Sequence, residues 1–557
     1  MKSTMQETPL LISTLLRFGT TAYPRSEVIS WTDDGPRTTT YAELGEMCAQ
    51  LAHALRGLGI SGDKRVGTFM WNNAEHLAAY LAVPSMGSVL HALNIRLFPE
   101  QLVYVTNHGG SEVVIVDDTL AEPFSKLLPH LPAVKHVIVN GTVPDALRDN
   151  LAQHVQVHDW ATLLADQPTS YDWVTDMDEN DASSLCYTSG TTGNPKGVAY
   201  SHRSNYIHAL AGAGTFHWSA ADKLLVVVPL FHANAWGFPY IAMLSGSSLV
   251  MPGRYLQAEP LAAMIQQLGI SGGAGVPTIW ADLLRYFTEH EDADASTVKR
   301  LIVGGSAAPE SMMRRYQDEL GIEIIHAWGM TETSPMGSVA IPPPELEEGS
   351  DDYWRSRSSQ GRLLASFEGR IIGPDGTVQP SDGVSVGELE IRGPWIAASY
   401  LSNEGDAQAD IDDRASRFTD DGWFRTGDVG ALTADRFLKL TDRSKDVIKS
   451  GGEWISSVEL ENQIMSHPDV VEASVVNIPD EKWGERPLAT VVLAEGSTTT
   501  PADLRKHLAD KVAHWQLPER WAIIDEVPKT SVGKFDKKRL RERYAAGDLS
   551  IERPTDG

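Results

Sequence analysis

Short runs of β-branched and aliphatic residues recur along about the first 440 positions and alternate with segments of helical periodicity. These apolar runs occupy residues 113–116, 137–139, 224–228 and 301–303. Amphipathic segments lie between them, as at residues 261–268 and 309–320, where Pro309 suits a first helical turn. Apolar strands between amphipathic helices are typical of partly parallel, buried sheets. This part of the chain therefore predicts an α/β architecture.

The pattern changes beyond Asp442. Residues 456–459 form a capping box for a helix that runs to about residue 465, and Thr500-Pro501 begins another helix. Strands are predicted at residues 471–476, 488–493 and 521–524. A small α+β domain is the expected result. The basic run at residues 534–543 is expected to be a solvated helix face.

Length and charge narrow the class of protein. A chain of 557 residues is too long for one ordinary core and predicts at least two domains. The formal net charge of −27 argues against non-specific binding to nucleic acid, so an anionic ligand must be held by local positive groups. Two cysteines give no disulfide framework, and no apolar stretch approaches the ~18 residues of a membrane span. We expect a soluble, cytoplasmic protein without a membrane span.

The stretch from Tyr187 to Gly197 has the composition of a loop that wraps phosphate. Glycines let the backbone approach an anion, hydroxyl groups donate hydrogen bonds, and Lys196 adds a positive charge. A Walker A loop is excluded, because Lys196 is followed by glycine and valine rather than by serine or threonine. Apolar residues on both sides predict a strand, the loop and a second strand, and disfavour a flexible linker.

Six further motifs follow the phosphate loop in order. They occupy residues 229–232, 304–309, 326–333, 423–428, 442–453 and 528–534. Together they resemble the adenylate-forming superfamily of acyl-CoA synthetases, adenylation domains and luciferases over nearly the whole chain. Residues 231–236 and 275–280 are most similar to bacterial fatty-acyl-CoA ligases, a branch that also shows a tryptophan at position 328 in place of the more usual tyrosine.

The resemblance refines the expected domains. Residues 387–392 alternate polar and apolar side chains, which predicts an antiparallel strand in a β-rich subdomain near residues 360–440. The resemblance implies that this subdomain joins two stacked α/β sheets in a large N-terminal domain over residues 1–441. A hinge linker at residues 442–446 and a small mobile α+β domain at residues 447–557 would complete the chain.

The implied activity is a ligase reaction in two steps. A carboxylate and ATP give an acyl-adenylate and pyrophosphate, and the thiol of coenzyme A then displaces AMP. ATP, Mg²⁺ and coenzyme A are the expected co-substrates and cofactor. Residues 231–236 favour a medium- or long-chain fatty acid and hence a role in lipid metabolism, and short-chain, methylthio and aryl acids stay open. The resemblance extends to dimeric enzymes, so a homodimer is an open alternative.

Residue roles are carried over from the matching motifs. The β- and γ-phosphates would be held by Thr188, Ser189, Gly190, Thr191, Thr192 and Lys196. Glu332 would be a magnesium ligand, since carboxylates suit hard Mg²⁺, and Thr331 would contact a phosphate. Gly304, Gly305 and Ala307 would form one wall of the adenine slot, and Trp328 the other. The nucleotide site would also include Ser306, His326, Ala327, Gly329 and Met330. Asp428 would accept hydrogen bonds from both ribose hydroxyls, and Arg443 would contact ribose and phosphate.

The remaining roles concern catalysis and the acyl group. Lys534 would bridge the substrate carboxylate and the α-phosphate, holding two anions at reacting distance. His232 would orient the carboxylate, and Trp236 would gate an acyl pocket that also includes Gly275 and Val276. A packed histidine at a strand end and a core tryptophan are the structural alternatives for the first two.

The last group of predicted residues belongs to the hinge. Lys445 would be the pivot that exchanges Lys534 for a loop on the coenzyme A side. That loop would comprise Lys449, Gly451, Gly452 and Glu453. An ordinary linker lysine is the alternative for Lys445.

Three other classes of function were weighed against the ligase. An ATP-dependent kinase or hydrolase would leave the loop of Lys534 without a role and would release ADP. A stand-alone adenylation enzyme would load a carrier protein in place of coenzyme A. A non-catalytic sensor would typically have lost Lys196, Glu332 or Lys534, and all three are present.

Overall fold

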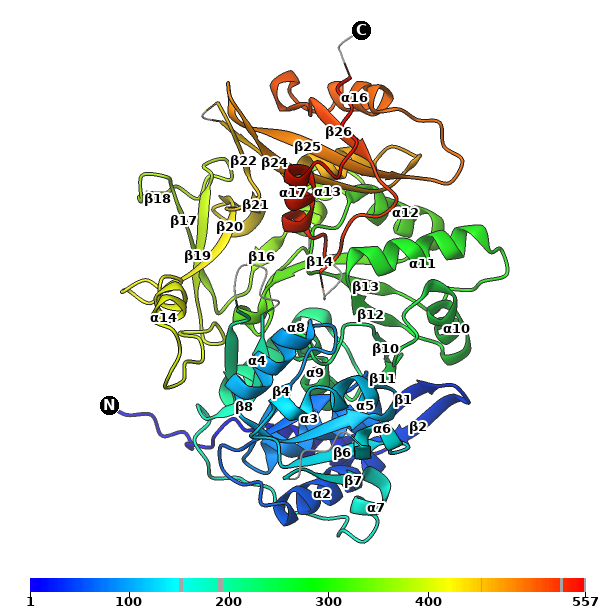
Figure 1. Ribbon diagram of the computed structural model, residues 1–557, viewed down its shortest axis with the longest axis vertical. Coiled ribbons are helices and arrows are strands. Elements are labelled where there is room, and N and C mark those ends of the chain that lie inside the picture. The colour runs from blue at the N-terminus through cyan, green and yellow to red at the C-terminus, as the bar shows by residue number, and fades with distance from the viewer. Residues whose placement is uncertain (150–153, 189–193, 452, 531–533, 555–557) are drawn as a thin grey trace.

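The computed structural model describes residues 1–149, 154–188, 194–451, 453–530 and 534–554. Figure 1 shows a large α/β domain below a small domain that is built from the C-terminal part of the chain. The predicted fold class, a large α/β domain followed by a small α+β domain, is confirmed. None of the helices in these described ranges has the length and apolar character needed to cross a membrane.

The first sheet of the large domain has seven strands in the order β7-β6-β5-β3-β4-β8-β9. These are β3 (Arg65–Phe69), β4 (Val89–Ala92), β5 (Ser111–Asp117), β6 (His136–Asn140), β7 (Gln156–Asp159), β8 (Ala182–Tyr187) and β9 (Gly197–Ser201). All neighbours are parallel except β8 and β9, the two strands predicted on either side of the phosphate loop, which pair antiparallel. The end of β8 and the start of β9, which flank the loop, therefore lie at the same end of this sheet.

The second sheet is a path of fourteen strands in the order β18-β17-β19-β20-β21-β16-β15-β14-β13-β12-β10-β11-β1-β2. Its parallel part contains β1 (Glu27–Thr32), β10 (Lys223–Val226), β11 (Ser248–Met251), β12 (Gly272–Gly275), β13 (Arg300–Val303) and β14 (Glu323–Gly329), with β2 (Gly35–Thr40) antiparallel at the edge. The antiparallel part contains β15 (Met336–Val339), β16 (Gly361–Leu363), β17 (Glu368–Ile372), β18 (Val378–Gln379), β19 (Gly387–Arg392), β20 (Phe424–Leu432) and β21 (Phe437–Arg443). The predicted β-rich subdomain is thus continuous with this sheet through β14 and β15.

Helices connect and cover the two sheets. In the large domain they are α1 (Ile12–Ala22), α2 (Tyr41–Gly57), α3 (Ala74–Ser85), α4 (Pro99–Gly109), α5 (Asp118–Ser125), η1 (Leu128–His130), α6 (Asp145–Asp149), α7 (Trp160–Leu164), α8 (His202–Phe216), η2 (Ala233–Gly237), α9 (Phe238–Ser245), α10 (Ala258–Leu268), α11 (Pro277–Glu289), α12 (Glu310–Leu320), η3 (Thr331–Thr333), α13 (Asp351–Ser358) and α14 (Gln408–Ala415). Pro309 is the N-cap of α12, one position before the first turn that the sequence suggested for it.

The small domain is built on a sheet of β22 (Ile448–Ser450), β23 (Glu453–Ile455), β24 (Val470–Asp480), β25 (Gly484–Leu493) and β26 (Arg520–Ile523). Its helices are α15 (Ser457–Met465), α16 (Pro501–Ala509), η4 (His514–Gln516) and α17 (Lys537–Ala546). Ser456 and Thr500 cap α15 and α16 with their side chains. The predicted linker at 442–446 begins inside β21, which runs to Arg443.

The expectation that the basic run of α17 is only a solvated face is wrong. Leu540 is fully buried, and Lys537 Nζ lies 2.9 Å from the carboxylate of Glu461 in α15. Arg541 pairs with Asp446 at 2.9 Å. The basic residues of this helix therefore hold the domain together and anchor the start of the chain that enters it.

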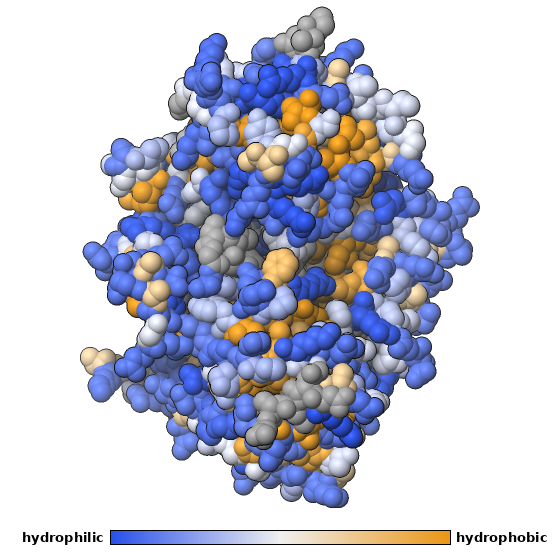
Figure 2. Space-filling model, in the orientation of Figure 1, coloured by the Kyte–Doolittle hydropathy of each residue, from blue (hydrophilic) through white to orange (hydrophobic). Residues whose placement is uncertain are grey.

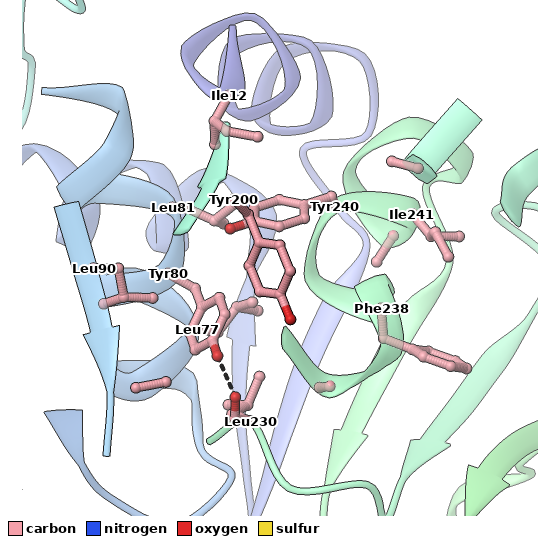
Figure 3. Close-up of a cluster of buried hydrophobic side chains, with 14 of the residues drawn as sticks. Ile12, Leu77, Tyr80, Leu81, Leu90, Tyr200, Leu230, Phe238, Tyr240 and Ile241 are labelled. Carbon is pink, nitrogen blue, oxygen red and sulfur yellow. Dashed lines mark hydrogen bonds between the residues drawn. The ribbon is translucent and has the colours of Figure 1, made fainter. Parts of the chain in front are cut away.

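Buried tyrosines of the main core hold the loops that carry the site. In Figure 3 the hydroxyl of Tyr80 donates a hydrogen bond to the carbonyl of Leu230, just before His232. The hydroxyl of Tyr200, in the same cluster, donates to the carbonyl of Thr331 at 2.7 Å. Most of the surface shown in Figure 2 is hydrophilic, in keeping with the high net charge, and apolar side chains show in the recess below the small domain.

Candidate active site

A cavity lies between the large domain and the small domain. The large domain lines it with the ends of β13 and β14, with η3 and with β21, and the small domain contributes Lys534. It brings together fourteen residues predicted from the sequence: Thr188, Lys196, His232, Trp236, Gly304, Gly305, Ala327, Trp328, Gly329, Met330, Thr331, Glu332, Arg443 and Lys534. Segments that are up to about 350 positions apart in the chain, such as those of Thr188 and Lys534, therefore meet in one place.

A second, larger cavity adjoins the first and shares its wall. Trp328, Arg443 and Lys534 border both cavities. Predicted residues that border the second one alone are Ser306, Ala307, His326, Asp428 and Lys445. The described residues assigned to the nucleotide thus line one continuous cleft between the two domains.

Asp428 is held in a fixed orientation at this cleft. It lies in β20 opposite Arg443 in β21 and is only 3% exposed. Its Oδ2 accepts a hydrogen bond from Trp328 Nε1 at 2.8 Å, and its Oδ1 lies 3.2 Å from Arg443 Nε. Attraction by Asp428 raises the pKa of Arg443, which stays charged. Each carboxylate oxygen has one fixed partner and a remaining lone pair, so the group can accept two further hydrogen bonds from a diol.

Lys196 and Glu332 both line the first cavity. The backbone N–H of Thr188 donates to the carbonyl of Lys196 at 2.9 Å, which closes the base of the phosphate loop. Lys196 Nζ lies 5.5 Å from the ring centroid of Tyr400, and the Tyr400 hydroxyl donates to Glu332 Oε1 at 2.5 Å. The tyrosine thereby separates the ammonium from a carboxylate that is 6% exposed.

The surroundings of Glu332 fit magnesium. Within the described ranges, no group of three or more histidine, cysteine, aspartate or glutamate side chains is placed to hold a metal ion. Mg²⁺ is usually bound through one or two carboxylates and completes its shell with phosphate oxygens and water. A single oriented glutamate beside a phosphate loop is such a donor set.

His232 and Trp236 flank an unusual turn. Residues 233–237 form η2 with left-handed backbone angles, φ lying between 46° and 82°. Left-handed conformations cost roughly 1–2 kcal/mol for each L-residue, so the surroundings must hold them. Asn234, fully buried in the turn, donates to Asn205 Oδ1 at 3.1 Å and to Ser184 Oγ at 3.3 Å. This network fixes the turn whose two ends reach the cavity.

His232 is a neutral group in this site. Burial, reinforced by the positive charges of Lys534 and Arg96, lowers the pKa of its imidazole to about 3. At physiological pH one ring nitrogen therefore donates and the other accepts. The side chain is suited to orient a carboxyl group by hydrogen bonding, without forming an ion pair.

Trp236 packs on the Gly304-Gly305 loop. A Cβ built on Gly304 would lie 3.0 Å from the indole ring and 3.1 Å from the carbonyl oxygen of Ala327. Gly305 has φ of 83°, and a Cβ there would lie 3.6 Å from Lys534 Cε. The contacts at Gly304 leave little room for a side chain, and the left-handed φ of Gly305 favours glycine there. The loop therefore forms a thin wall between the indole and Lys534.

Lys534 is the residue that the small domain supplies. Burial lowers the pKa of its ammonium to about 8, helped by Arg443 and opposed by Asp428 and Glu332. Its backbone N–H donates to Thr530 Oγ1 at 3.2 Å. The ammonium thus stands among the groups assigned to the carboxylate and the phosphates.

Several predicted residues are not in the cleft. Gly275 and Val276 line neither cavity and lie behind the glycine loop, where the N–H of Gly304 donates to the carbonyl of Gly275 at 3.3 Å. Lys449 lies in β22, Glu453 begins β23 and Gly451 follows β22, and Lys449 and Gly451 line neither cavity. Ser189, Gly190, Thr191, Thr192 and Gly452 lie outside the described residues.

Sequence reasoning missed other residues that line the first cavity. They include Asn194, Tyr400, Arg417 and Thr426. Tyr400 and Arg417 lie in the irregular segment between β19 and β20, where no motif or periodicity points to the cleft. Asn194 and Thr426 did carry a signal, since Asn194 sits inside the phosphate-loop sequence and Thr426 inside the motif at residues 423–428.

Comparison with known proteins explains this combination of loops. A family model described as AMP-binding enzyme matches residues 19–401, and a model described as AMP-binding enzyme C-terminal domain matches residues 459–534. The chain belongs to the AMP-binding enzyme family. The resemblance to the adenylate-forming superfamily is thereby confirmed, and the second match covers the segment that ends at Lys534.

Relatives match this family member over nearly their full length. The chain is 40% identical to a medium-chain-fatty-acid–CoA ligase of Ectopseudomonas oleovorans, over 98% of each chain. It is 39% identical to a 3-methylmercaptopropionyl-CoA ligase of Ruegeria lacuscaerulensis, over 97% of this chain and 98% of the relative. An anthranilate CoA ligase solved with anthranoyl-AMP superposes with a TM-score of 0.85 at 23% identity, over 98% of this chain and all of the other, which supports the fold.

Proposed function

We propose that this enzyme activates a medium- or long-chain fatty acid as an acyl-adenylate and transfers the acyl group to coenzyme A, with release of AMP and pyrophosphate. The coarser assignment, an AMP-forming acid–thiol ligase that uses ATP, Mg²⁺ and coenzyme A, follows from the family and its full-length relatives. One observation supports the proposal most. Lys534 of the small domain and Glu332 of the large domain border a single cavity that also has an apolar part.

The apolar part of the cavity favours an aliphatic monocarboxylic acid. Phe216, Phe238, Ile302 and Met336 line it, and they carry no charge. The charged side chains among the described lining residues are Lys196, Glu332, Arg417, Arg443 and Lys534. Each of these has a partner or role at the phosphate side, so a second carboxylate in the apolar part would be left without a cation, at a high desolvation cost.

A methylthio acid is the second candidate. Two relatives at 39% identity are 3-methylmercaptopropionyl-CoA ligases. A thioether is apolar and flexible, so a pocket of phenylalanine, isoleucine and methionine side chains accepts sulfur as readily as a methylene. Chain-length preference separates the candidates, because a fatty-acid ligase should gain from each added methylene up to the end of its pocket.

The first step joins two anions, and the cleft offsets their repulsion. An oxygen of the substrate carboxylate attacks the α-phosphorus, the bond from that phosphorus to the bridging oxygen breaks, and pyrophosphate leaves. Lys534 would hold the carboxylate against the α-phosphate, while neutral His232 orients it by hydrogen bonding. Lys196 would bind the leaving phosphates. Mg²⁺, held by Glu332, would supply further charge neutralisation.

The second step requires a different face of the small domain. The thiol sulfur attacks the acyl carbon, and AMP leaves. Lys534 occupies the cleft while the β22–β23 hairpin with Lys449 and Gly451 lies away from it. We propose that the small domain reorients about Lys445, just beyond the end of β21, and brings this hairpin to the thiol.

A panel of carboxylic acids of increasing chain length tests the function. Pyrophosphate release with ATP and Mg²⁺ is measured with and without coenzyme A, and the nucleotide product is identified. We expect AMP as the nucleotide product and the highest kcat/KM for an acid of medium or long chain. Without coenzyme A, each enzyme molecule should release at most one pyrophosphate. ADP as product would refute adenylation, and turnover that is independent of coenzyme A would refute it as the acceptor.

A further inference from the structure

The lysine of the phosphate loop is engaged by a carboxylate from another segment. Lys196 Nζ lies 2.6 Å from Asp413 Oδ2. The lysine side chain is 16% exposed and that of Asp413 is 57% exposed. The ammonium therefore points into the cleft wall, and the aspartate reaches it from the rim.

Asp413 belongs to a helix that is firmly docked beside the loop. Its neighbour Arg414 pairs with Asp406 at 2.7 Å and donates to the carbonyl of Leu401 at 2.6 Å. Asp406 also lies 3.3 Å from His108 Nε2, and His108 Nδ1 contacts the hydroxyl of Tyr187 at 2.6 Å. This chain of buried contacts ties α14 to the end of β8, where the phosphate loop begins. The position of Asp413 is thus built into the fold.

A second carboxylate of α14 reaches the same loop. Asp410, one turn before Asp413, accepts a hydrogen bond from Asn194 Nδ2 at 3.3 Å. Residues three apart share one face of a helix. Asp412 lies off that face, and its Oδ1 accepts from Gln408. The acidic face of α14 therefore contacts the two described polar side chains on the C-terminal side of the loop.

We propose that Asp413 competes with the terminal phosphates of ATP for the ammonium of Lys196. Asp413 holds the lysine, yields it when the polyphosphate binds, and takes it back as pyrophosphate leaves. This inference rests on the proposed role of Lys196 in the nucleotide site. Asp413 is thus a positioning residue that acts on substrate affinity and product release through Lys196.

Electrostatics sets the direction of this effect. The bound phosphates and the Asp413 carboxylate are both anions, and an ammonium paired with a carboxylate at 2.6 Å attracts a second anion less strongly, because the carboxylate offsets its charge. Because Asp413 is more than half exposed, solvent screens the pair, and its loss should change phosphate affinity by no more than about fivefold. The ion pair between Asp413 and Lys196 is therefore weak enough for phosphate to displace at each turnover, and its effect on phosphate affinity is large enough to measure.

The test uses the full-length enzyme with inorganic pyrophosphate and Mg²⁺ as the probe. Calorimetric titration compares the wild type with Asp413→Asn. We expect pyrophosphate to bind about two- to fivefold more tightly to the variant, the KM for ATP to fall by a similar factor, and product inhibition by pyrophosphate to become stronger. Asp412→Asn removes the same charge from the same helix without touching the loop and should match the wild type.

A double-mutant cycle shows whether the effect passes through the lysine. Lys196→Met weakens pyrophosphate binding, and Asp413→Asn should add nothing in that background. An equal gain in both backgrounds would mean simple long-range repulsion and would overturn the proposal. Unchanged or weaker pyrophosphate binding by Asp413→Asn would overturn it too. A wild type that binds neither pyrophosphate nor ATP would instead refute the proposed function, and this inference with it.

Discussion

The contact between Asp442 and α15 gives a sharp prediction about the small domain. Asp442 is paired with Val429 in the sheet of the large domain and precedes the proposed pivot Lys445. Its Oδ2 accepts from the backbone N–H of Ser457 at 2.8 Å and from the Ser457 hydroxyl. Ser457 in turn accepts from Lys537. Because the two sides of these contacts lie on opposite sides of the pivot, rotation of the small domain must break them.

The size of the effect follows from burial. Asp442 is 6% exposed and Ser457 is fully buried, so solvent does not replace these hydrogen bonds. Hydrogen bonds to charged groups contribute about 1.5–3 kcal/mol, against about 1 kcal/mol for neutral ones. Asp442→Asn keeps an acceptor of nearly the same shape and removes the charge. We expect it to destabilise the orientation that presents Lys534 by about 1–2 kcal/mol, a factor of about 5–30 in its population.

Single-turnover assays of the two steps measure this shift. Where the population of the orientation that presents Lys534 limits the rate, acyl-adenylate formation from acid and ATP should slow by that factor. Thioester formation from supplied acyl-adenylate and coenzyme A should be unchanged or faster. Asp446→Asn is the control, because Asp446 pairs with Arg541 and both lie beyond the pivot. If Asp442→Asn slowed both steps equally, or if Asp446→Asn slowed acyl-adenylate formation as much, the idea that Asp442 holds the small domain in this orientation would be refuted.

Three further predictions concern the cleft itself. Lys534→Ala should nearly abolish acyl-adenylate formation and spare thioester formation from supplied acyl-adenylate; equal loss of both would remove the assignment. The kcat/KM of adenylation should fall as pH rises through about 8, where the free enzyme loses the charge of Lys534, while the second step keeps its rate. Trp236→Ala should open the wall beside Gly304 and shift the preference toward longer acids, and an unchanged chain-length profile would argue for a purely structural tryptophan.

The elements that local chemistry determines were predicted well. β19 spans residues 387–392 as the alternation indicated, and Ser456 and Thr500 cap the predicted helices. Alternation and capping depend on residues that are neighbours in the chain, so the sequence carries them directly. The continuity of the β-rich strands with the second sheet could not be predicted in this way. It depends on the pairing of β14 with β15, and the pattern of residues within a strand does not specify which strand it pairs with.

The site shows the same division. Ordered motifs placed His232, Glu332, Asp428 and Lys534 in one cleft, although no single motif would have done so. Tyr400 and Arg417 were missed, since their approach to the cleft depends on the docking of an irregular segment. The left-handed turn at residues 233–237 was not predicted either, because alanine and tryptophan rarely adopt this conformation and a single asparagine is only a weak signal of it.

The basic run of α17 shows why charge patterns mislead when they are considered alone. Lysines at the end of a chain are usually solvated, because burying an unpaired ammonium is costly. Burial does lower the pKa of Lys537, but attraction by Glu461 and Asp442 outweighs it, and the pKa lies above its usual value. The partners come from α15 and from the end of β21, so the charge that looked solvated in the sequence joins β21 of the large domain to α15 of the small domain. The sequence pattern shows only that burying such a charge is unfavourable, whereas the fold shows whether an acidic partner lies close enough to offset this.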